Sequence, residues 1–454
     1  MDASLQNALA QARADYAEIH LERRATTQIA YVGKELEDIS QFSSVAGSVR
    51  ALVKGGWGFV SFHSLDDLPH RVRMACEQAA MVGQTESHLA PVPPAVARVV
   101  QATVATDPRQ VPLADKEALA RRYNQRILAH DHVQTSSVRY RDAAVQSTFV
   151  STEGAEVEQE AVFCGMAVAA IARDGANVQR AFKQVGDLRG YPICEGLDDE
   201  CDRVVERAVA LLAAEPVQGG HYTVIANPVL AGVFAHEAFG HLSEADFVYE
   251  NPQLAEIMQL GKRFGPDPLS IVDDPTLDGM AGSYRYDSEG TPARPTALIK
   301  DGILTSRLHS RETAARMGEE PTGNARAITC EYPPIVRMSN TYIEPRDWEF
   351  GDLVADTGDG LYACGSIGGQ TDMEMFTFSA EEAFLIKDGR IADRVREVVL
   401  TGNVFETLAN IDAIGNDLEF LGGLGGCGKE GQFPLRVSTG APHIRIRNCL
   451  VGGR

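Results

Sequence analysis

The chain has 454 residues, of which 44% are hydrophobic and 23% charged, and this length gives room for two or three domains with cores of their own. Its formal net charge of −21 argues against nucleic-acid binding, which needs a basic surface. Apolar runs stay shorter than the roughly 18 residues of a membrane span, and the N-terminus lacks signal-peptide features. The eight cysteines form no CxxC pair, which favours a reducing compartment over a disulfide framework. We therefore expect a cytoplasmic protein with no membrane or nucleic-acid partner.

The N-terminal half combines alternating apolar residues with helical patterns. Period-two alternation predicts an antiparallel meander, with strands at residues 17–21, 29–31, 49–53 and 57–62. Helical spacing predicts further elements at residues 3–13, just after 66–67, at 115–129 and around 204–212. Residues 133–171 return to a β pattern, and the three prolines of 90–99 indicate a linker. These features predict an N-terminal α+β domain over residues 1–216, with a subdivision near 90–112.

The C-terminal half is predicted to be β-rich and to start with a buried strand, 222–226. Asn227-Pro228 then has the pattern of a helix start, an N-cap residue followed by proline. Residues 251–295 are rich in Pro, Asp and Gly, a composition typical of lids and binding surfaces. Two later segments, 298–304 and 383–391, have the pattern of hairpins with Asp-Gly turns. We expect a barrel- or sandwich-like catalytic domain over residues 217–454.

The helix after Asn227 carries the sequence His236-Glu237-Ala238-Phe239-Gly240-His241. Two imidazoles that bind a metal and a carboxylate that takes a proton from the attacking water are the components of a zinc hydrolase. In the usual H-E-x-x-H pattern the histidines are four residues apart, but here they are five apart. An ideal α-helix would separate them by about 140°, whereas a π-bulge would return them to one face. Either the two histidines are unrelated helix residues, or the helix is distorted near Gly240.

A zinc hydrolase needs a third protein ligand, and the residue pattern leaves several candidates. Glu244 and Asp246 are close in sequence. Cys427 lies in a segment with six glycines, 422–432, where the backbone can approach a ligand closely. Cys364 lies in a second glycine-rich stretch. Composition does not rank the two cysteines, and the two carboxylates are candidates by their proximity in sequence.

The whole set of motifs resembles the TldD/PmbA family of metallopeptidases. Beyond the histidine motif, the matching stretches follow in family order over most of residues 220–454. They are Asp287-Ser288-Glu289-Gly290-Thr291-Pro292, Thr322-Gly323-Asn324, Met338-Ser339-Asn340-Thr341-Tyr342, Gly368-Gly369-Gln370, Ile414-Gly415-Asn416-Asp417, Cys427-Gly428-Lys429-Glu430-Gly431-Gln432 and Val451-Gly452-Gly453. The N-terminal half is similar to the family more diffusely, through residues 14–18 and 55–59.

The resemblance implies that His236, His241 and Cys427 bind Zn²⁺ and that Glu237 is the general base. It gives Cys364 no ligand role. Because the chain keeps the histidine motif, it resembles the TldD type, which forms homodimers or heterodimers with a TldE/PmbA-type chain. Family substrates are small or unfolded peptides, held in an enclosed cleft as an added β-strand and therefore recognised mainly by their backbone.

Two other interpretations remain at the level of the sequence. A peptide-binding or scaffold protein would use the same metal structurally, in a closed four-ligand site. A thiol enzyme would use Cys427 as nucleophile with a histidine base, for which His443 is nearest in sequence. The acidic pair Asp273-Asp274 has the pattern of capping or surface charge, and Lys429 and Gln432 are candidates for substrate contact.

Overall fold

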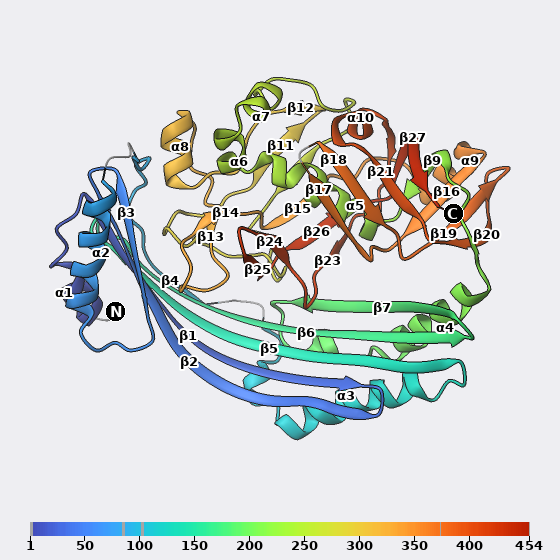
Figure 1. Cartoon of the computed structure of the whole chain (residues 1–454), viewed down its shortest axis with the longest axis horizontal. Helices are drawn as coiled ribbons and strands as arrows, with labels where there is room; N and C mark the ends of the chain where they lie inside the picture. Colours follow the sequence, from blue (N-terminus) through green and yellow to red (C-terminus); the bar gives the residue numbers. More distant parts are fainter. Residues whose placement is uncertain (1–2, 84–86, 101–103, 373, 454) are drawn as a thin grey trace.

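The computed structural model describes residues 3–83, 87–100, 104–372 and 374–453. A seven-stranded sheet fills the N-terminal half, and its strands follow the order β3-β2-β1-β5-β6-β4, with β7 also on β6. The strand bounds are β1 Tyr16–Val32, β2 Glu35–Val53, β3 Gly56–Phe62, β4 Val96–Val100, β5 Val133–Ser151, β6 Glu156–Asp174 and β7 Asn177–Asp187. The long strands curve beneath the C-terminal half (Figure 1).

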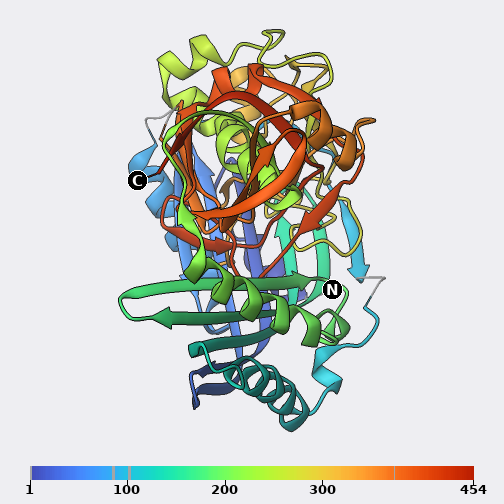
Figure 2. The same ribbon diagram turned by 90° about the vertical axis from the view of Figure 1, so that its right-hand side faces the viewer.

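Helices cover parts of this sheet and bury two apolar clusters. The short helix α1 (Ala3–Leu9) and α2 (Leu68–Val82) pack at the end formed by β1, β2 and β3. Helices α3 (Leu113–Leu128) and α4 (Asp198–Ala213) pack on β5, β6 and β7. Helix α3 lies on the side of the sheet away from the C-terminal strands in both views (Figures 1 and 2). The predicted antiparallel α+β region is confirmed.

Two N-terminal expectations were wrong in detail. The segments 17–21 and 29–31 are one continuous strand, β1, because the residues between them pair with both β2 and β5. The segment 90–99 is not all linker, since its last residues enter β4 and pair in parallel with Glu156–Glu160 of β6. Predicted helices agree to within a few residues, except that α1 ends at Leu9 and α4 starts earlier, at Asp198.

The C-terminal half contains a ten-stranded and a six-stranded sheet. The larger has the order β17-β18-β21-β27-β9-β16-β19-β20-β8, with β22 on β27, and the smaller the order β12-β11-β10-β15-β26-β23. Bounds in the larger sheet are β8 Glu215–Pro216, β9 Gly220–Ala226, β16 Gly360–Cys364, β17 Gly368–Asp372, β18 Met375–Ser379, β19 Glu382–Lys387, β20 Arg390–Arg396, β21 Val399–Asn403, β22 Ile411–Ile414 and β27 Ile444–Gly452. Those in the smaller are β10 Ile271–Asp273, β11 Thr296–Lys300, β12 Ile303–Leu304, β15 Asn340–Ile343, β23 Glu419–Leu421 and β26 Ser438–Ala441.

The described part of this half also has two short ribbons and six α-helices. The ribbons pair β13 (Ala325–Arg326) with β14 (Ile335–Val336) and β24 (Cys427–Lys429) with β25 (Gln432–Leu435). The helices are α5 Pro228–Phe234, α6 Ala245–Glu250, α7 Pro252–Ile257, α8 Arg311–Met317, α9 Phe350–Thr357 and α10 Val404–Ala409. Among the described residues, no helix is both long and apolar enough to cross a membrane.

Helix α5 contacts strands of both C-terminal sheets, β26 and β15 of the smaller and β9 and β16 of the larger. The largest apolar cluster of the described chain joins this helix to both sheets. The β-rich class of this half is confirmed, but its sheets do not close into a barrel. The division at residues 216 and 217 stays a prediction. A rigid helix between two sheets is a precise support for side chains.

The helix changes its winding directly after α5, as the histidine spacing predicts. Residues Ala235–Gly240 form one π-helical turn, in which the backbone N–H of His241 donates to the carbonyl of His236. Gly240 lies where this turn meets the buried side chain of Met338, and a Cβ there would lie 2.0 Å from the Met338 sulfur. The distorted helix is therefore confirmed, and glycine is required by close packing.

Gly240→Ala is expected to lower the apparent free energy of unfolding by about 1–3 kcal/mol, because fully buried Met338 must move to admit the methyl group. The measurement is urea denaturation of the metal-free protein. Gly351→Ala in α9 is the matched control, since a Cβ there meets nothing within 4 Å and alanine favours the helix. Equal stability of the two variants would contradict this account of the turn.

Candidate metal centre

Local sequence determines where the motif helix begins. The Asn227 side chain accepts a hydrogen bond of 3.0 Å from the backbone N–H of Leu230, and Pro228 occupies the first helical turn. Strand β9 leads into this cap and is an interior strand of the ten-stranded sheet, paired with both β27 and β16. The histidine motif therefore lies on a helix whose start is fixed by a cap directly after an interior strand.

The π-turn directs both imidazoles toward one sulfur from the far end of the chain. The ring centroids of His236 and His241 are 5.3 Å apart, and Nε2 of His241 lies 3.3 Å from Sγ of Cys427. One ligand atom from each of the three residues lies within 4.8 Å of the others. Tetrahedral Zn²⁺ with bonds of about 2.0 Å to nitrogen and 2.3 Å to sulfur separates its ligand atoms by roughly 3.3–3.6 Å, which this group can reach.

His236 provides an independent test of whether a metal fits. Its residue is 2% exposed, and neither ring nitrogen has a hydrogen-bond partner among the described residues. A buried polar group without a partner is costly, and a metal ion would satisfy a nitrogen of this ring. The donor set of two imidazoles and one thiol matches zinc coordination. Their role as ligands stays a prediction.

The surroundings of Cys427 favour its ionised form. Burial alone would raise the pKa of its thiol, but the neighbouring His236 and His241 outweigh burial and lower it to about 5. Strand β24 holds the residue through its pairing with Leu435, and the buried Arg337 guanidinium donates to the Cys427 carbonyl at 2.8 Å. A thiolate is the form of cysteine that binds metals.

Glu237 lies beside the three residues and keeps access to solvent. Its Oε2 is 3.7 Å from Nε2 of His241, and its side chain is 29% exposed, whereas His236 and Cys427 are almost fully buried. A general base must reach both the attacking water and the leaving group, so partial exposure suits the role that the sequence predicts for Glu237.

Glu244 has a role that the sequence did not reveal. Expected only as a nearby ligand candidate, it instead lies behind His241, where its Oε2 accepts from Nδ1 at 2.9 Å. Lys429 lies 3.1 Å from the same oxygen and 2.5 Å from Oδ1 of Asp246. Burial would raise the pKa of Glu244, but His241 and Lys429 together lower it to about 2. The ionised carboxylate fixes the proton of His241 on Nδ1 and leaves Nε2 for a metal.

Glu244→Gln is expected to weaken metal affinity by about 10–100-fold, because the amide loses the charge that orients and polarises His241. Competition with a chromogenic chelator measures this affinity. Asp246→Asn is the matched control, since Asp246 shares Lys429 but not the imidazole. If both variants bind metal as tightly as the original chain, the carboxylate does not orient the ligand.

Other residues that the sequence suggested lie outside the group. Cys364 ends β16 and is not one of the three clustered residues. His443 pairs with Asp417 at 2.6 Å, whereas the histidines clustered with Cys427 are His236 and His241. Lys429 is a buried ion-pair partner, and Gln432 bonds to backbone groups of Ile328 and Pro333.

The expectation that Asp273 is surface or capping charge was wrong. The residue is fully buried in β10, and its carboxylate accepts hydrogen bonds from Ser339, Thr341 and Asn324. These partners belong to the motifs Met338-Ser339-Asn340-Thr341-Tyr342 and Thr322-Gly323-Asn324. The two motifs thus form one structural network that supports the sheet beneath the π-turn.

Comparison with known proteins gives matches across almost the entire chain. The PmbA/TldA metallopeptidase domain 1 matches residues 17–81, the central domain residues 106–214 and the C-terminal domain residues 219–453. The chain belongs to the PmbA/TldD metallopeptidase family. The His-Glu-x-x-x-His turn and Cys427 both lie within the family's C-terminal domain.

Curated relatives are named as metalloproteases. One from Synechocystis sp. is 45% identical over 98% of this chain and 96% of its own length. One from Methanothermobacter thermautotrophicus is 38% identical over 97% of this chain and 96% of its own length. A zinc metalloprotease TldD homolog from Saccharolobus solfataricus is 31% identical over 71% and 72%. The family and its TldD-like character are confirmed.

Solved structures share the fold of this PmbA/TldD chain. A protein from Thermotoga maritima described as a modulator of DNA gyrase aligns with a TM-score of 0.80 at 20% identity, covering 99% of each chain. TldE from Thermococcus kodakarensis aligns with a TM-score of 0.78 at 17% identity, covering 99% of this chain and all of that one. At these identities the comparison confirms the α+β architecture alone.

Proposed function

We propose that this PmbA/TldD chain is a zinc-dependent peptidase in which His236, His241 and Cys427 hold the metal and Glu237 is the general base. The convergence of these three side chains on one point, beside a partly exposed carboxylate, is the observation that carries the proposal. When bound, zinc would supply a Lewis acid that activates water and polarises the scissile carbonyl.

The protein's own groups then have separate tasks. Glu237 accepts a proton from the attacking water and passes it to the leaving amine nitrogen. Glu244 keeps the proton of His241 on Nδ1, and Lys429 balances the charge of that carboxylate. Arg337 holds the backbone of Cys427 in place. Together they keep the donor atoms positioned before substrate arrives.

Backbone recognition of small or unfolded peptides has a candidate position at β17. This strand is the edge of the ten-stranded sheet, pairs only with β18 among the described strands, and lies against the π-turn. Its residues Gly368, Gly369 and Gln370 are exposed and form one of the family motifs. An exposed edge can receive a peptide as an added strand, with hydrogen bonds that are independent of side chains. We propose that the substrate lies in this position, within an enclosed cleft.

Partner and compartment are also proposals. The likeness to TldE supports assembly with a TldE/PmbA-type chain or with a second copy of this chain. All eight cysteines are free, which supports a cytoplasmic, reducing location. A mass measurement of the chain purified alone distinguishes a homodimer from a chain that awaits another partner.

Removal of the metal tests the enzymatic proposal. The purified chain is expected to contain about one zinc per protomer and to cleave unstructured peptides, and a chelator should abolish cleavage until zinc is restored. Thermal denaturation with and without chelator is measured in parallel. A peptide-binding protein with a structural metal would instead bind peptides without cleaving them, with or without a partner chain, and that result would replace the peptidase proposal.

A further inference from the structure

Arginines gather in a cavity between the long N-terminal sheet and the C-terminal half. The cavity has a volume of about 390 Å³. Arg24 enters it from β1, Arg141 from β5, Arg326 from β13 and Arg436 from the residue after β25. Four guanidinium groups at one place are notable in a chain with a net charge of −21. We name these four residues the arginine pocket.

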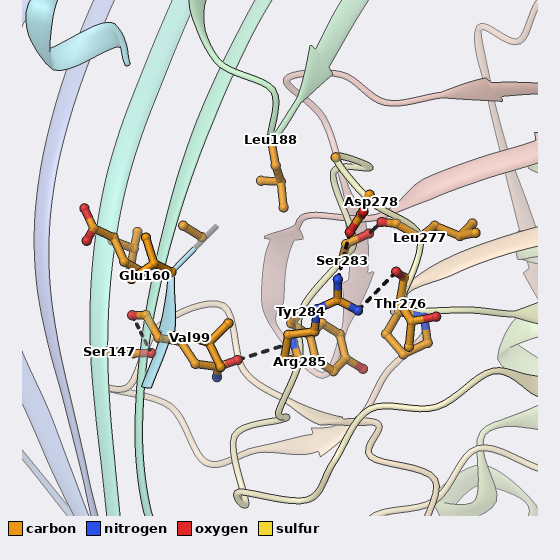
Figure 3. Close-up of a pocket in the computed structure, with 16 residues that line it drawn as sticks. Val99, Ser147, Glu160, Leu188, Thr276, Leu277, Asp278, Ser283, Tyr284 and Arg285 are labelled. Atoms are coloured by element: carbon orange, nitrogen blue, oxygen red, sulfur yellow. Dashed lines mark hydrogen bonds and ion pairs between the residues drawn. The ribbon is translucent and has the colours of Figure 1, made fainter. Parts of the chain in front are cut away.

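The arginine pocket opens into a cleft along the sheet. It shares Ser147, Leu188 and Tyr284 with a neighbouring cavity. Figure 3 shows that second cavity, in which Ser147 and Glu160 of the sheet lie opposite Tyr284 and Arg285 of a C-terminal loop. An extended molecule can therefore reach the arginines along the inner face of the sheet.

Most of the positive charge in the pocket lacks a carboxylate partner. Arg24 pairs with Glu22 at 3.0 Å, but among the described residues Arg326 donates only to the backbone carbonyls of Met338 and Arg436. Neither the Arg141 nor the Arg436 guanidinium makes a hydrogen bond or ion pair within the described part of the chain, and Nε of Arg141 is buried. Asp287 also lines the cavity, but its oxygens accept from the backbone N–H groups of residues 289, 291 and 325.

The pKa shifts of two pocket arginines agree with their lack of carboxylate partners. Burial lowers the pKa of Arg436 to about 9, and Arg24 and Arg141 lower it further against the opposing effect of the Glu22 carboxylate. Burial and Arg24 also lower the pKa of Arg141. Burying charge without a counterion is costly, so an anion that enters the pocket would relieve both desolvation and repulsion.

The pocket lies beside the proposed metal centre. Its wall includes Gly423–Gly425, which precede the β24–β25 ribbon, and Leu435, which ends β25 and is the ladder partner of Cys427. Partners in such a ladder are about 5 Å apart. Burial lowers the pKa of Arg326, and the negative charge of Cys427 acts in the opposite direction. One ribbon thus separates the anion-attracting pocket from the predicted zinc ligand.

We propose that the arginine pocket binds a carboxylate of the peptide, either its C-terminus or an acidic side chain, while another part of that peptide lies at the metal centre. This inference rests on the proposed peptidase function. Guanidinium groups present planar pairs of donors that match a carboxylate, and the apolar face of Phe163, 4.3 Å from the Arg436 guanidinium, keeps that group in place. The pocket would make the enzyme selective for acidic or carboxyl-terminal segments.

Binding and cleavage of matched peptides test the pocket separately from catalysis. Four fluorescent versions of one unstructured peptide are used: a free or amidated C-terminus, each with an internal Glu or Gln. Fluorescence anisotropy with the metal-free full chain should show roughly tenfold to hundredfold tighter binding of a carboxylate form than of the peptide lacking both carboxylates. The carboxylate that increases the affinity, either the C-terminus or the Glu side chain, is the group that enters the pocket.

The combined Arg141→Gln and Arg436→Gln variant should lose this preference and bind the peptide lacking both carboxylates within about twofold of the original chain. Arg436→Lys keeps the charge but loses the paired donors, so it should retain part of the preference and provides a milder replacement should the double variant fail to fold. Arg285→Gln is the control within the same cleft, since Arg285 is already paired with Asp278 at 2.8 Å.

Equal binding of all four peptides would contradict the proposed role of the arginine pocket. A preference that survives loss of both arginines would contradict it as well. Cleavage of the same peptides by the zinc-loaded chain is scored separately. A carboxylate preference without any cleavage would contradict the proposed peptidase function but support the proposed role of the arginine pocket. Cleavage without a carboxylate preference would support the peptidase function and contradict the role of the arginine pocket.

Discussion

Glu237→Gln should retain its metal and lose peptide cleavage by about 10²–10⁴-fold, the usual contribution of a general base. The amide has nearly the size and shape of the carboxylate but cannot accept a proton. Glu237 is outside the three clustered ligand atoms, and its Oε2 lies 3.7 Å from Nε2 of His241. The substitution therefore removes the proton acceptor without removing a predicted ligand.

Zinc content by mass spectrometry and the rate of cleavage of one peptide measure the two effects on the same sample. Glu250→Gln is the matched control, because Glu250 is an exposed glutamate on the following helix α6. Cleavage at the original rate would show that another group accepts the proton. Loss of zinc together with activity would instead make Glu237 part of the coordination sphere.

Sequence reasoning was strongest where chemistry depends on spacing. Two histidines five residues apart require a widened turn if they are to share a metal, and the π-turn at 235–240 has that geometry. The glycine at its end was a sound indication, since Met338 leaves no room for a larger residue. The Asp-Gly turns also gave both hairpins, β11–β12 and β19–β20, because the φ angles of Asp301 and Asp388 are positive.

Sequence reasoning failed where a polar residue has a distant partner. The middle of β1 did not follow the apolar alternation because Arg23, an exposed charge, takes an odd-numbered position on the strand face of Leu21 and Ile29. Asp273 resembled surface charge, although its four donors come from segments more than 50 residues away. Glu244 could have been recognised, since it stands three residues after His241, but Lys429, which completes its charge balance, is far along the chain.

Cys427 itself was singled out by its glycine-rich surroundings, but the residue pattern alone ranked it no higher than Cys364. The structure separates the two thiols: Cys427 lies 3.3 Å from Nε2 of His241, whereas Cys364 lies outside the clustered group. Gly426 explains part of the glycine content, because a Cβ there would lie 2.3 Å from the Leu435 carbonyl oxygen. The close approach of the two strands is what brings the sulfur to the histidines.

Cys427→Ser is therefore expected to lose zinc and all detectable cleavage. Serine preserves the size of this buried side chain, but its hydroxyl does not ionise near neutral pH and cannot replace the thiolate that His236 and His241 stabilise. Metal affinity should fall by more than the 10–100-fold expected for a residue that only orients a ligand. Equilibrium dialysis against buffered zinc, with the cleavage rate at each zinc concentration, measures both quantities.

Cys364→Ser is the matched control and should bind zinc and cleave peptide as the original chain does, because Cys364 is not among the clustered ligand atoms. The experiment also separates the metal from the thiol mechanism. A thiol enzyme would lose cleavage in Cys427→Ser while keeping its zinc and would tolerate a chelator. If the Cys427 thiolate binds the metal, the single substitution removes a zinc ligand and with it the catalytic centre. Zinc and cleavage are then lost together, which the thiol mechanism does not predict.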